Sequence, residues 1–285
     1  MSYRGVVAAV TALLPVKEYH EGYLREAVDC MHAQSSADWE LLVIGDETNH
    51  SELAGFLSSD LRDPRVSLIT REGRRLAGAL NTGMRVARTE FVAILLGDDL
   101  WTPDAVRVLG DAIRDFPAAD FFHTARKIVD DDGRPISPVY PPTPDVSAAD
   151  FETGSPVKHL MCWRRELALS VGGLDESLPP IGTDDFDFPW TMADHGARFQ
   201  PLPECLYFHR DHRAGYRLTT HLPLSDCLRG LRRIMRKHGQ SRVTTERRVF
   251  RARRTYLKQC LYRSNLHRRV LGEVDPRRGW RDTYV

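Results

Sequence analysis

Apolar and polar positions alternate in two ways along the first 116 residues of the chain. Four runs rich in β-branched and aliphatic residues indicate buried strands, and they span 6–16, 39–46, 65–70 and 90–99. Between and after them apolar residues recur every three or four positions, which indicates amphipathic helices at 21–34, 52–61, 76–88 and 103–115. Strands that alternate with helices predict an α/β fold with a mostly parallel, doubly wound sheet.

Beyond residue 116 the pattern is less regular. Residues 123–136 predict a strand followed by a turn, and the proline-rich stretch 135–156 predicts an irregular surface loop. Short helices are expected at 164–173 and 186–196, and Pro189 limits the second one to a helix start or a kink. The last part predicts two basic amphipathic helices, at 224–239 and 245–272.

The composition places the chain among ordinary proteins of aqueous compartments. Of its 285 residues, 42% are apolar and 28% are charged. No stretch approaches the roughly 18 apolar residues of a membrane span, and the N-terminus lacks a credible cleavage site, so we expect a cytoplasmic protein. Five cysteines without a C-x-x-C pair argue against both a disulfide framework and a cysteine-rich zinc site.

Charge is distributed unevenly between two parts of the chain. Residues 229–285 carry 18 Lys and Arg against 4 acids, a balance of +14, which leaves −13 for residues 1–228 because the whole chain is +1. The basic part is therefore expected to be a separate helical extension of a domain that covers residues 1–228. It either docks on the acidic domain or binds an anionic membrane or nucleic acid. We favour docking.

Two adjacent carboxylates, Asp98 and Asp99, follow the fourth strand in the stretch "LLGDDLWTP". Ligands of open α/β sheets bind beyond the carboxyl ends of strands. The chain has neither G-x-G-x-x-G nor G-x-x-x-x-G-K-[ST], so a phosphate must be held by something other than a glycine-rich loop. Mn²⁺ or Mg²⁺ on the two carboxylates would neutralise a diphosphate. A solvated loop is the alternative interpretation.

Five motifs occur in a fixed order from about Val6 to Tyr216, and together they resemble the family 2 glycosyltransferases with the GT-A fold. They are "LPVKEYHEGYLREAV", "ELLVIGDET", "AGALNTGMRVA", "EFVAILLGDDLWTPDAV", and the long stretch from "WRRELALSVGGLDE" through "TDDFD" to "LYFHRDH". Three positions depart from the family pattern. Gly45 and Leu96 each stand where the family has an acid, and Leu80 stands where it has an arginine.

The resemblance implies a Rossmann-like sheet whose nucleotide-binding half covers about 1–103 and whose acceptor-binding half covers about 104–228. It implies inverting, metal-dependent transfer of a sugar, most often from a UDP-sugar, to an acceptor hydroxyl. The Q-x-x-R-W signature of processive polysaccharide synthases is absent, so we expect non-processive transfer. A homodimer and peripheral membrane contact stay open, and no nucleic-acid partner is expected.

The resemblance also implies roles for individual residues. Asp185 is the expected general base, and Asp187 is expected either on the helix surface or behind the base as a supporting group. Metal ligands are expected to be Asp98, Asp99 and His212, with His209 competing for the place of His212. The expected donor-binding residues are Pro15, Val16, Asp46, Asn81 and Asp98. The expected acceptor-binding residues are His159, Trp163, Asp184 and Trp190.

Several alternatives remain at this stage. Asp46 can cap a turn instead of binding a base, and the tryptophans can pack in the core instead of contacting an acceptor. A nucleotide-sugar pyrophosphorylase shares this type of sheet, but it should have a glycine-rich loop near the first strand. The other alternative is a degenerate transferase scaffold whose basic extension binds an anionic membrane or nucleic acid.

Overall fold

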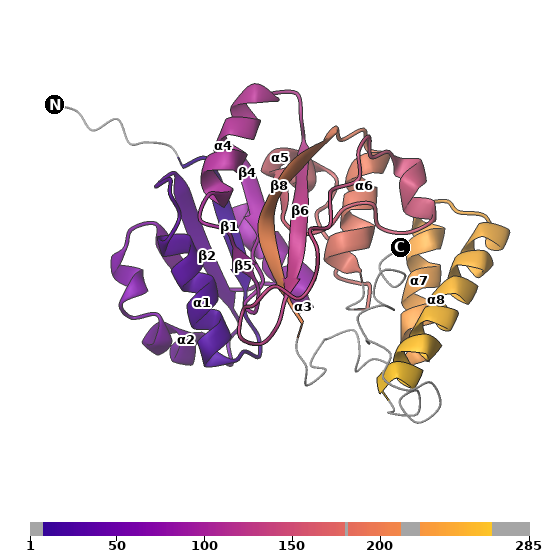
Figure 1. The fold of residues 1–285 in the computed structure, drawn as a ribbon, viewed down its shortest axis with the longest axis horizontal. Helices are drawn as coiled ribbons and strands as arrows, with labels where there is room; N and C mark the ends of the chain where they lie inside the picture. The colour runs from indigo at the N-terminus through magenta and orange to yellow at the C-terminus, as the bar shows by residue number, and fades with distance from the viewer. Residues whose placement is uncertain (1–7, 180–181, 212–222, 264–285) are drawn as a thin grey trace.

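The computed structural model describes residues 8–179, 182–211 and 223–263, and their side chains as far as residue 257. Within them, one twisted sheet has the strand order β3-β2-β1-β4-β7-β6-β8-β5 (Figure 1). The strands are β1 (Val10–Pro15), β2 (Trp39–Gly45), β3 (Val66–Thr70), β4 (Phe91–Ile94), β5 (Leu100–Trp101), β6 (Phe121–Val129), β7 (Met161–Arg164) and β8 (Phe199–Arg210).

Strands β1 to β4 are parallel, as the alternating pattern predicts. Strand β7 runs antiparallel to both β4 and β6, and β8 is parallel to β6, while the short β5 is antiparallel to β8. The strands β1, β2, β3, β4, β6 and β8 therefore all point the same way. Their carboxyl ends lie along one edge of the sheet, where a ligand site is expected.

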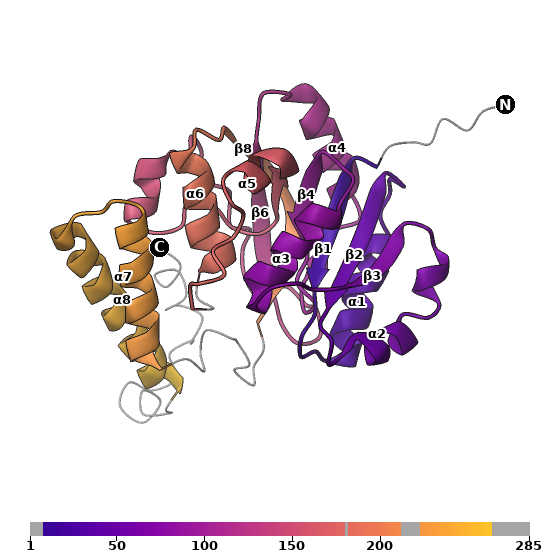
Figure 2. The same cartoon turned by 180° about the vertical axis from the view of Figure 1, so that it is seen from behind.

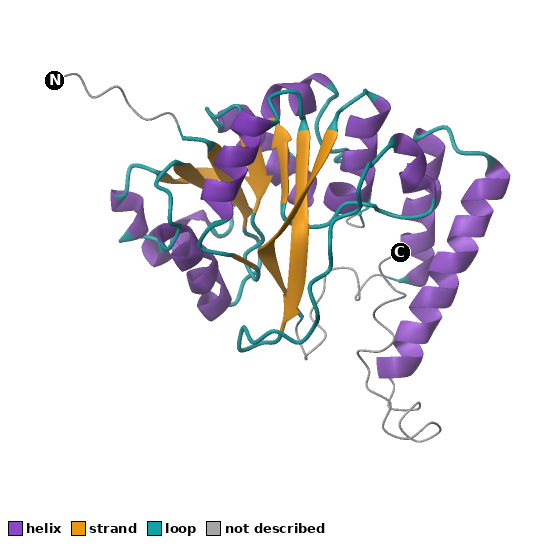
Figure 3. Ribbon diagram, turned by 45° about the horizontal axis from the view of Figure 1, so that its top comes forward, coloured by secondary structure: helices purple, strands orange, loops and turns teal. Residues whose placement is uncertain are grey.

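Helices cover both faces of the sheet (Figure 3). They are α1 (Glu21–His32), α2 (His50–Phe56), α3 (Arg75–Val86), α4 (Ala105–Asp115), α5 (Arg165–Ser170) and α6 (Phe188–Asp194). Successive residues of β1 point to opposite faces of the sheet. Leu14 belongs to the apolar layer with α1 and α4, and Leu13 belongs to the layer with α3 and α6. Figure 2 shows α3, α5 and α6 together on the second face. These two apolar layers hold the loops of the ligand edge in place.

The basic extension forms two paired helices beside α6, α7 (Leu224–Lys237) and α8 (Arg242–Arg263) (Figures 1 and 2). Ile234 and Met235 of α7 are buried in the same apolar layer as α6. Arg232 of α7 donates two hydrogen bonds, of 2.8 and 2.9 Å, to Glu246 of α8. No helix of the described part of the chain is long and apolar enough to cross a membrane.

Some boundaries differ from the sequence pattern for local reasons. The helix predicted at 52–61 ends at Phe56, and a separate 3-10 turn covers Asp60–Arg62. The helix predicted at 186–196 is preceded by a wide π-helical turn, Thr183–Asp187, and Pro189 lies in the first turn of α6. Strands β5 and β7 are too short, with two and four residues, to show a period in the sequence.

Candidate active site

Asp99 lies at the centre of the ligand edge and is completely buried. Its Oδ2 accepts a hydrogen bond from the Tyr207 hydroxyl at 2.6 Å, and its Oδ1 accepts one from the backbone N–H of Arg210 at 2.7 Å. Burial opposes ionisation, but the charge of His209 and three hydrogen bonds to the carboxylate outweigh burial and hold the pKa of Asp99 below its usual value. The fold therefore keeps Asp99 charged and joins β4 to β8 through it.

Asp98 has a different environment from its neighbour. It is partly exposed, so a cation can approach its carboxylate from solvent. Its backbone carbonyl accepts a hydrogen bond from Arg210 Nε at 2.8 Å, which fixes the loop between β4 and β5. The two adjacent acids therefore divide into a buried carboxylate that anchors β8 and a more open one that faces the ligand edge.

A metal site can be tested against the residues of this edge. The described residues contain no group of three His, Cys, Asp or Glu side chains placed to hold a metal ion, and His212 lies outside them. His209 is 20% exposed, and its Nδ1 lies 3.2 Å from Asp99 Oδ2, so its other ring nitrogen is the one that can bind a ligand. Metal-ligating histidines are usually oriented in this way by a carboxylate. Asp98 and His209 thus offer donor atoms of the kind that a divalent cation binds, with Asp99 orienting the histidine.

Asp46 follows β2 and is 5% exposed. Lys17 donates a hydrogen bond to its Oδ2, and Arg71 contacts the same oxygen at 3.2 Å. The bond from Lys17, followed by the bond from the Thr48 hydroxyl, holds the pKa of Asp46 well below its usual range. The structure supports the turn-capping interpretation of Asp46, because the carboxylate accepts the Thr48 N–H at 2.9 Å, and it also keeps this carboxylate charged beside two cations.

The loop after β1, with Pro15 and Val16, is tied to the Asp46 turn by Asn49. The Asn49 amide donates to the carbonyls of Val16 (3.1 Å) and Lys17 (2.8 Å), and its Oδ1 accepts the N–H of Asp46 at 2.8 Å. This contact explains why glycine precedes Asp46. A Cβ at Gly45 would lie 2.8 Å from both Asn49 Oδ1 and Leu53 Cδ1, so a larger residue here would require these two side chains to move.

Asn81, predicted to bind the donor, connects two protein segments instead. Its amide donates to the carbonyl of Leu174 at 2.9 Å and to Glu176 at 3.0 Å, and its Oδ1 accepts the N–H of Leu174 at 2.9 Å. Gly173 has φ +68°, and a Cβ there would lie 2.4 Å from Asn81 Oδ1. The amide is therefore used to hold the G-G-x-D-E loop against α3.

The predicted base, Asp185, lies in the π-helical turn Thr183–Asp187, beside Asp184. Desolvation of the carboxyl group, followed by the negative charge of Asp184, raises the pKa of Asp185. The positive charges of His159, Lys158 and Arg126 partly oppose this rise. A carboxylate with a raised pKa is a stronger proton acceptor than one in water, which suits a general base.

His159 connects the two pairs of acids. Its ring stacks on that of Tyr207, with centroids 5.4 Å apart, and its Nε2 lies 3.5 Å from Asp184 Oδ2. Tyr207 in turn donates its hydroxyl hydrogen bond to Asp99. Through Tyr207 and His159 the structure therefore connects the Asp98–Asp99 pair with the Asp184–Asp185 pair.

Trp163 and Trp190 do not form an acceptor platform. Each is 1% exposed. Trp163 packs edge-on against Phe188, with centroids 5.1 Å apart, and Trp190 stacks on His238 at 4.2 Å. These rings have no face that a substrate could contact, so the structure supports the core-packing alternative for both.

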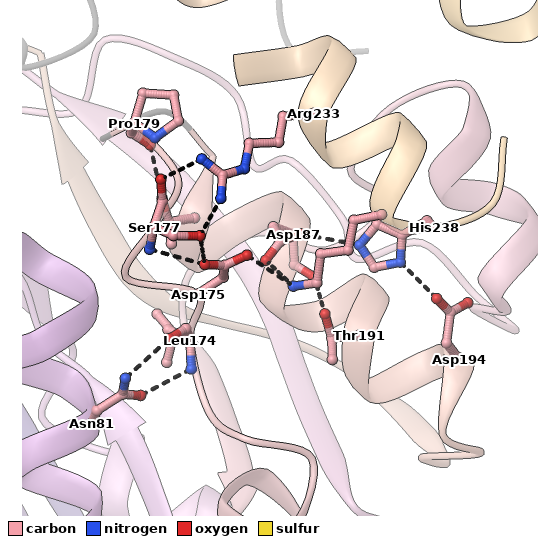
Figure 4. A network of polar contacts seen from close by, with 12 residues as sticks. Asn81, Leu174, Asp175, Ser177, Pro179, Asp187, Thr191, Asp194, Arg233 and His238 are labelled. Atoms are coloured by element: carbon pink, nitrogen blue, oxygen red, sulfur yellow. Dashed lines mark hydrogen bonds and ion pairs between the residues drawn. The ribbon is translucent and has the colours of Figure 1, made fainter. Parts of the chain in front are cut away.

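Asp187 is completely buried, which excludes the helix-surface alternative and leaves the supporting one, and Figure 4 shows its contacts. Lys237 Nζ donates to its Oδ2 at 2.7 Å, and His238 Nε2 lies 3.1 Å from its Oδ1. The other ring nitrogen of His238 lies 2.6 Å from Asp194. These contacts fasten the end of α7 to the turn that carries Asp185.

Sequence reasoning missed several polar residues of this site. Lys17 and Arg71 at Asp46, and Tyr207 at Asp99, were not singled out. Lys17 and Tyr207 stand inside motifs that were recognised, "LPVKEYH" and "LYFHRDH", and a buried acid needs a donor or a cation nearby. Arg71 directly follows a strand end, which is the position that could have marked it.

The family model described as Glycosyl transferase family 2 matches residues 11–163, more than half of the chain. The chain belongs to glycosyl transferase family 2. This family 2 glycosyltransferase is 28% identical over 216 residues to the O-antigen biosynthesis protein RfbC of Myxococcus xanthus. That match covers 74% of the chain but only 16% of RfbC, so the chain corresponds to about a sixth of the length of this relative.

Solved structures of low sequence identity share the fold of this glycosyltransferase. S. aureus TarS in complex with UDP-GlcNAc has a TM-score of 0.63 at 16% identity, covering 96% of this chain and 79% of that one. The mannosyltransferase PcManGT from Pyrobaculum calidifontis, in complex with GDP-Man and Mn²⁺, has a TM-score of 0.60 at 18% identity, covering 95% and 78%. The predicted GT-A fold is thus confirmed, and the family model confirms the predicted membership of glycosyl transferase family 2.

Proposed function

We propose that this glycosyltransferase transfers a sugar from a UDP-sugar to an acceptor hydroxyl, with inversion and without processivity. One observation carries the proposal. The Asp98–Asp99 pair and the Asp184–Asp185 pair, 85 residues or more apart in the sequence, meet at the carboxyl edge of one sheet through Tyr207 and His159. A carboxylate open to a cation, here Asp98, and a desolvated carboxylate that can take a proton, here Asp185, are the two groups that inverting transfer needs.

The donor nucleotide is proposed to lie over the ends of β1 and β2, near Pro15, Val16 and Asp46. Because Lys17 and Arg71 keep Asp46 ionised, its carboxylate can accept a hydrogen bond from the ring N–H of uracil. The complex of the structural neighbour TarS with UDP-GlcNAc supports UDP as the nucleotide.

Mn²⁺ or Mg²⁺ is the proposed cofactor, held by Asp98 and by a histidine, His209 or His212. The cation supplies positive charge that neutralises the donor diphosphate and stabilises its departure. Asp99 orients His209 through their contact of 3.2 Å and holds β8, on which that histidine lies, against the metal loop. The Mn²⁺ in the PcManGT complex supports a divalent cation.

Asp185 is the proposed general base, and Asp184 and His159 are the groups that keep it in place. Asp185 takes the proton from the acceptor hydroxyl as that oxygen attacks the anomeric carbon from the face opposite the diphosphate. An α-linked donor therefore gives a β-linked product. A base held in position contributes on the order of 10²–10⁴-fold to the rate.

A donor screen tests this proposal. The protein is incubated with UDP- and GDP-sugars, with and without Mn²⁺, and release of the nucleotide is measured. We expect a UDP-sugar to be hydrolysed fastest, and the hydrolysis to depend on Mn²⁺. Asp111→Asn, at an exposed carboxylate of α4, is the matched control and should behave as wild type. Preference for a GDP-sugar, or equal rates in EDTA, would contradict the nucleotide or the metal assignment.

A second candidate function has one observation in its favour. On α8 the side chains of Val243, Phe250 and Leu257 recur every seven residues and are 61%, 67% and 48% exposed. Arg247, Arg251 and Arg254 lie beside them. Such a face suits peripheral contact with an anionic membrane. That contact would place the transferase at a surface and does not replace its chemistry.

A further inference from the structure

Two positively charged side chains, Arg126 and Lys158, act electrostatically on Asp185, and a third, Arg248, lies close enough to Lys158 to act on it. Arg126 lies on β6, Lys158 lies just before β7, and Arg248 lies on α8. We call these three residues the cationic cluster. They are 32 and 90 residues apart along the chain, so only the tertiary structure brings them together.

Contacts of neighbouring residues place the cationic cluster at the base. Arg248 Cζ lies 5.9 Å from the ring centre of Phe186, which directly follows Asp185. Lys158 Nζ donates to the carbonyl of Ser155 at 3.1 Å, and the Ser155 hydroxyl donates to the carbonyl of Asp185. The third member, Arg126, is in register with Tyr207, whose ring stacks on His159.

The charges of the cationic cluster act on one another because they are held out of water. Arg126 is 6% exposed, and Lys158 and Arg248 are partly buried. Burial, followed by the charge of Arg126, lowers the pKa of Lys158 to about 8, although the negative charge of Asp185 opposes this. Cations kept close together and partly desolvated cost free energy, and an anion bound between them recovers part of that cost.

We propose that the cationic cluster binds the phosphoryl group of a phosphorylated acceptor whose hydroxyl faces Asp185. This proposal rests on the proposed function, because the base defines the acceptor side of the site. Two guanidinium groups and one ammonium group match the oxygens of a phosphate, with which arginine forms paired hydrogen bonds. Arg248 comes from α8 in the basic extension, so the extension contributes directly to acceptor recognition.

A phosphoryl group at the cationic cluster has two sources, the acceptor and the donor diphosphate. We favour the acceptor, because the proposed cation already neutralises the donor diphosphate at Asp98. Arg248 also reaches the site from beyond α6 and contacts Phe186, on the side of the base. The two sources are separated by filling the donor site first.

The experiment uses the full chain saturated with UDP and Mn²⁺, to which glucose 6-phosphate or glucose is added in a calorimeter. We expect glucose 6-phosphate to bind and glucose not to bind. Arg248→Gln should weaken the binding of glucose 6-phosphate at least about 10-fold, which corresponds to the loss of one hydrogen bond to a charged group. Arg253→Gln, at an exposed position of the same helix, should leave it unchanged. Lys158→Gln is a second variant, and it should weaken the binding of glucose 6-phosphate as Arg248→Gln does.

Three results would overturn the proposal. The first is that glucose 6-phosphate does not bind to the UDP-saturated wild type. The second is that Arg248→Gln leaves phosphate binding unchanged, and the third is that it weakens UDP binding instead, which would assign the cluster to the donor diphosphate. The UDP titration that precedes each measurement tests the proposed function by itself, so a failure of donor binding is recognised separately.

Discussion

Adjacent residues of the same chemical type have different environments throughout this site. Asp99 is buried and charged, and Asp98 is partly exposed. Asp187 is buried between Lys237 and His238, while Asp185, two positions earlier, is desolvated beside another carboxylate. Both residues lie in the π-helical turn, where Asp187 is fully buried and paired with cations and Asp185 stands beside Asp184.

Asp185→Asn should separate catalysis from stability. Turnover is expected to fall at least about 100-fold with donor affinity unchanged, the lower range for loss of a general base. Because the folded pKa of Asp185 is raised, its ionisation disfavours the folded state once the pH exceeds the unfolded pKa. The variant should therefore melt at a higher temperature than wild type at pH 7, and the difference should vanish at low pH.

The matched variant for this test is Asp187→Asn. It removes the charge that pairs with Lys237, so it should lower the melting temperature. If a well-folded Asp187→Asn is inactive while Asp185→Asn turns over normally, the base has been assigned to the wrong carboxylate. The pH profile of kcat/KM for the wild type should also fall on its acid side with an apparent pKa above 3.8, the ordinary pKa of an aspartic acid.

The metal loop gives a second prediction at the residue scale. Asp98→Ala should abolish Mn²⁺-dependent UDP affinity, measured by calorimetry, with little change in melting temperature because Asp98 is partly exposed. Asp99→Ala should abolish the same affinity but also destabilise the fold, since it leaves the buried Tyr207 hydroxyl without its acceptor. Unchanged Mn²⁺-dependent affinity in Asp98→Ala would refute the assignment, and His209→Gln and His212→Gln decide between the two histidines.

At the scale of elements, the end of α7 is part of the active-site architecture. His238 is 2% exposed, contacts Asp187 and Asp194, and stacks on Trp190. Together with Lys237 it holds Asp187, which lies two positions after Asp185 in the same turn, and Figure 4 shows the contact of His238 with Asp187. The extension is therefore connected to the catalytic turn by buried polar contacts as well as by the apolar residues of α7.

His238→Ala should lower the free energy of unfolding by about 1–3 kcal/mol, the cost of leaving a buried polar group without its partner. It should also lower kcat more than it changes KM for the donor, because the turn of Asp185 is loosened. Thermal melts and steady-state kinetics measure both effects. His195→Ala, at an exposed position after α6, is the control. A variant with wild-type stability and kinetics would show that this contact does not position the base.

For the whole molecule, the charge asymmetry agrees with docking of the extension. Lys237 pairs with Asp187, and the buried Ile234 and Met235 belong to the apolar layer of the catalytic domain. Removing residues 223–285 should lower the melting temperature by at least about 5 °C, from the loss of two buried side chains. An equally stable truncated chain, combined with binding of the full chain to anionic vesicles at about 0.15 M salt, would contradict docking in favour of the membrane function.

The sequence by itself determined the parallel half of the sheet and its ligand edge. Strands β1 to β4 and helices α1 to α4 are specified by local periodicity, and the sequence also shows that Asp98 and Asp99 come directly after a strand. The motif order was also sufficient for the family. Both the elements of this half and the family are predicted from neighbouring residues or from fixed spacings along the chain. Neither prediction needs a contact between distant residues.

Only the tertiary structure decided which candidates face the site. Asn81, Trp163 and Trp190 carry chemistry suited to ligands, but their partners come from other elements and hold them in the interior. The cationic cluster could not be predicted either, because Arg126 and Arg248 are 122 positions apart and neither belongs to a motif. Burial and charge pairing depend on these long-range contacts, and the hydrophobic pattern specifies elements without specifying which side chains meet.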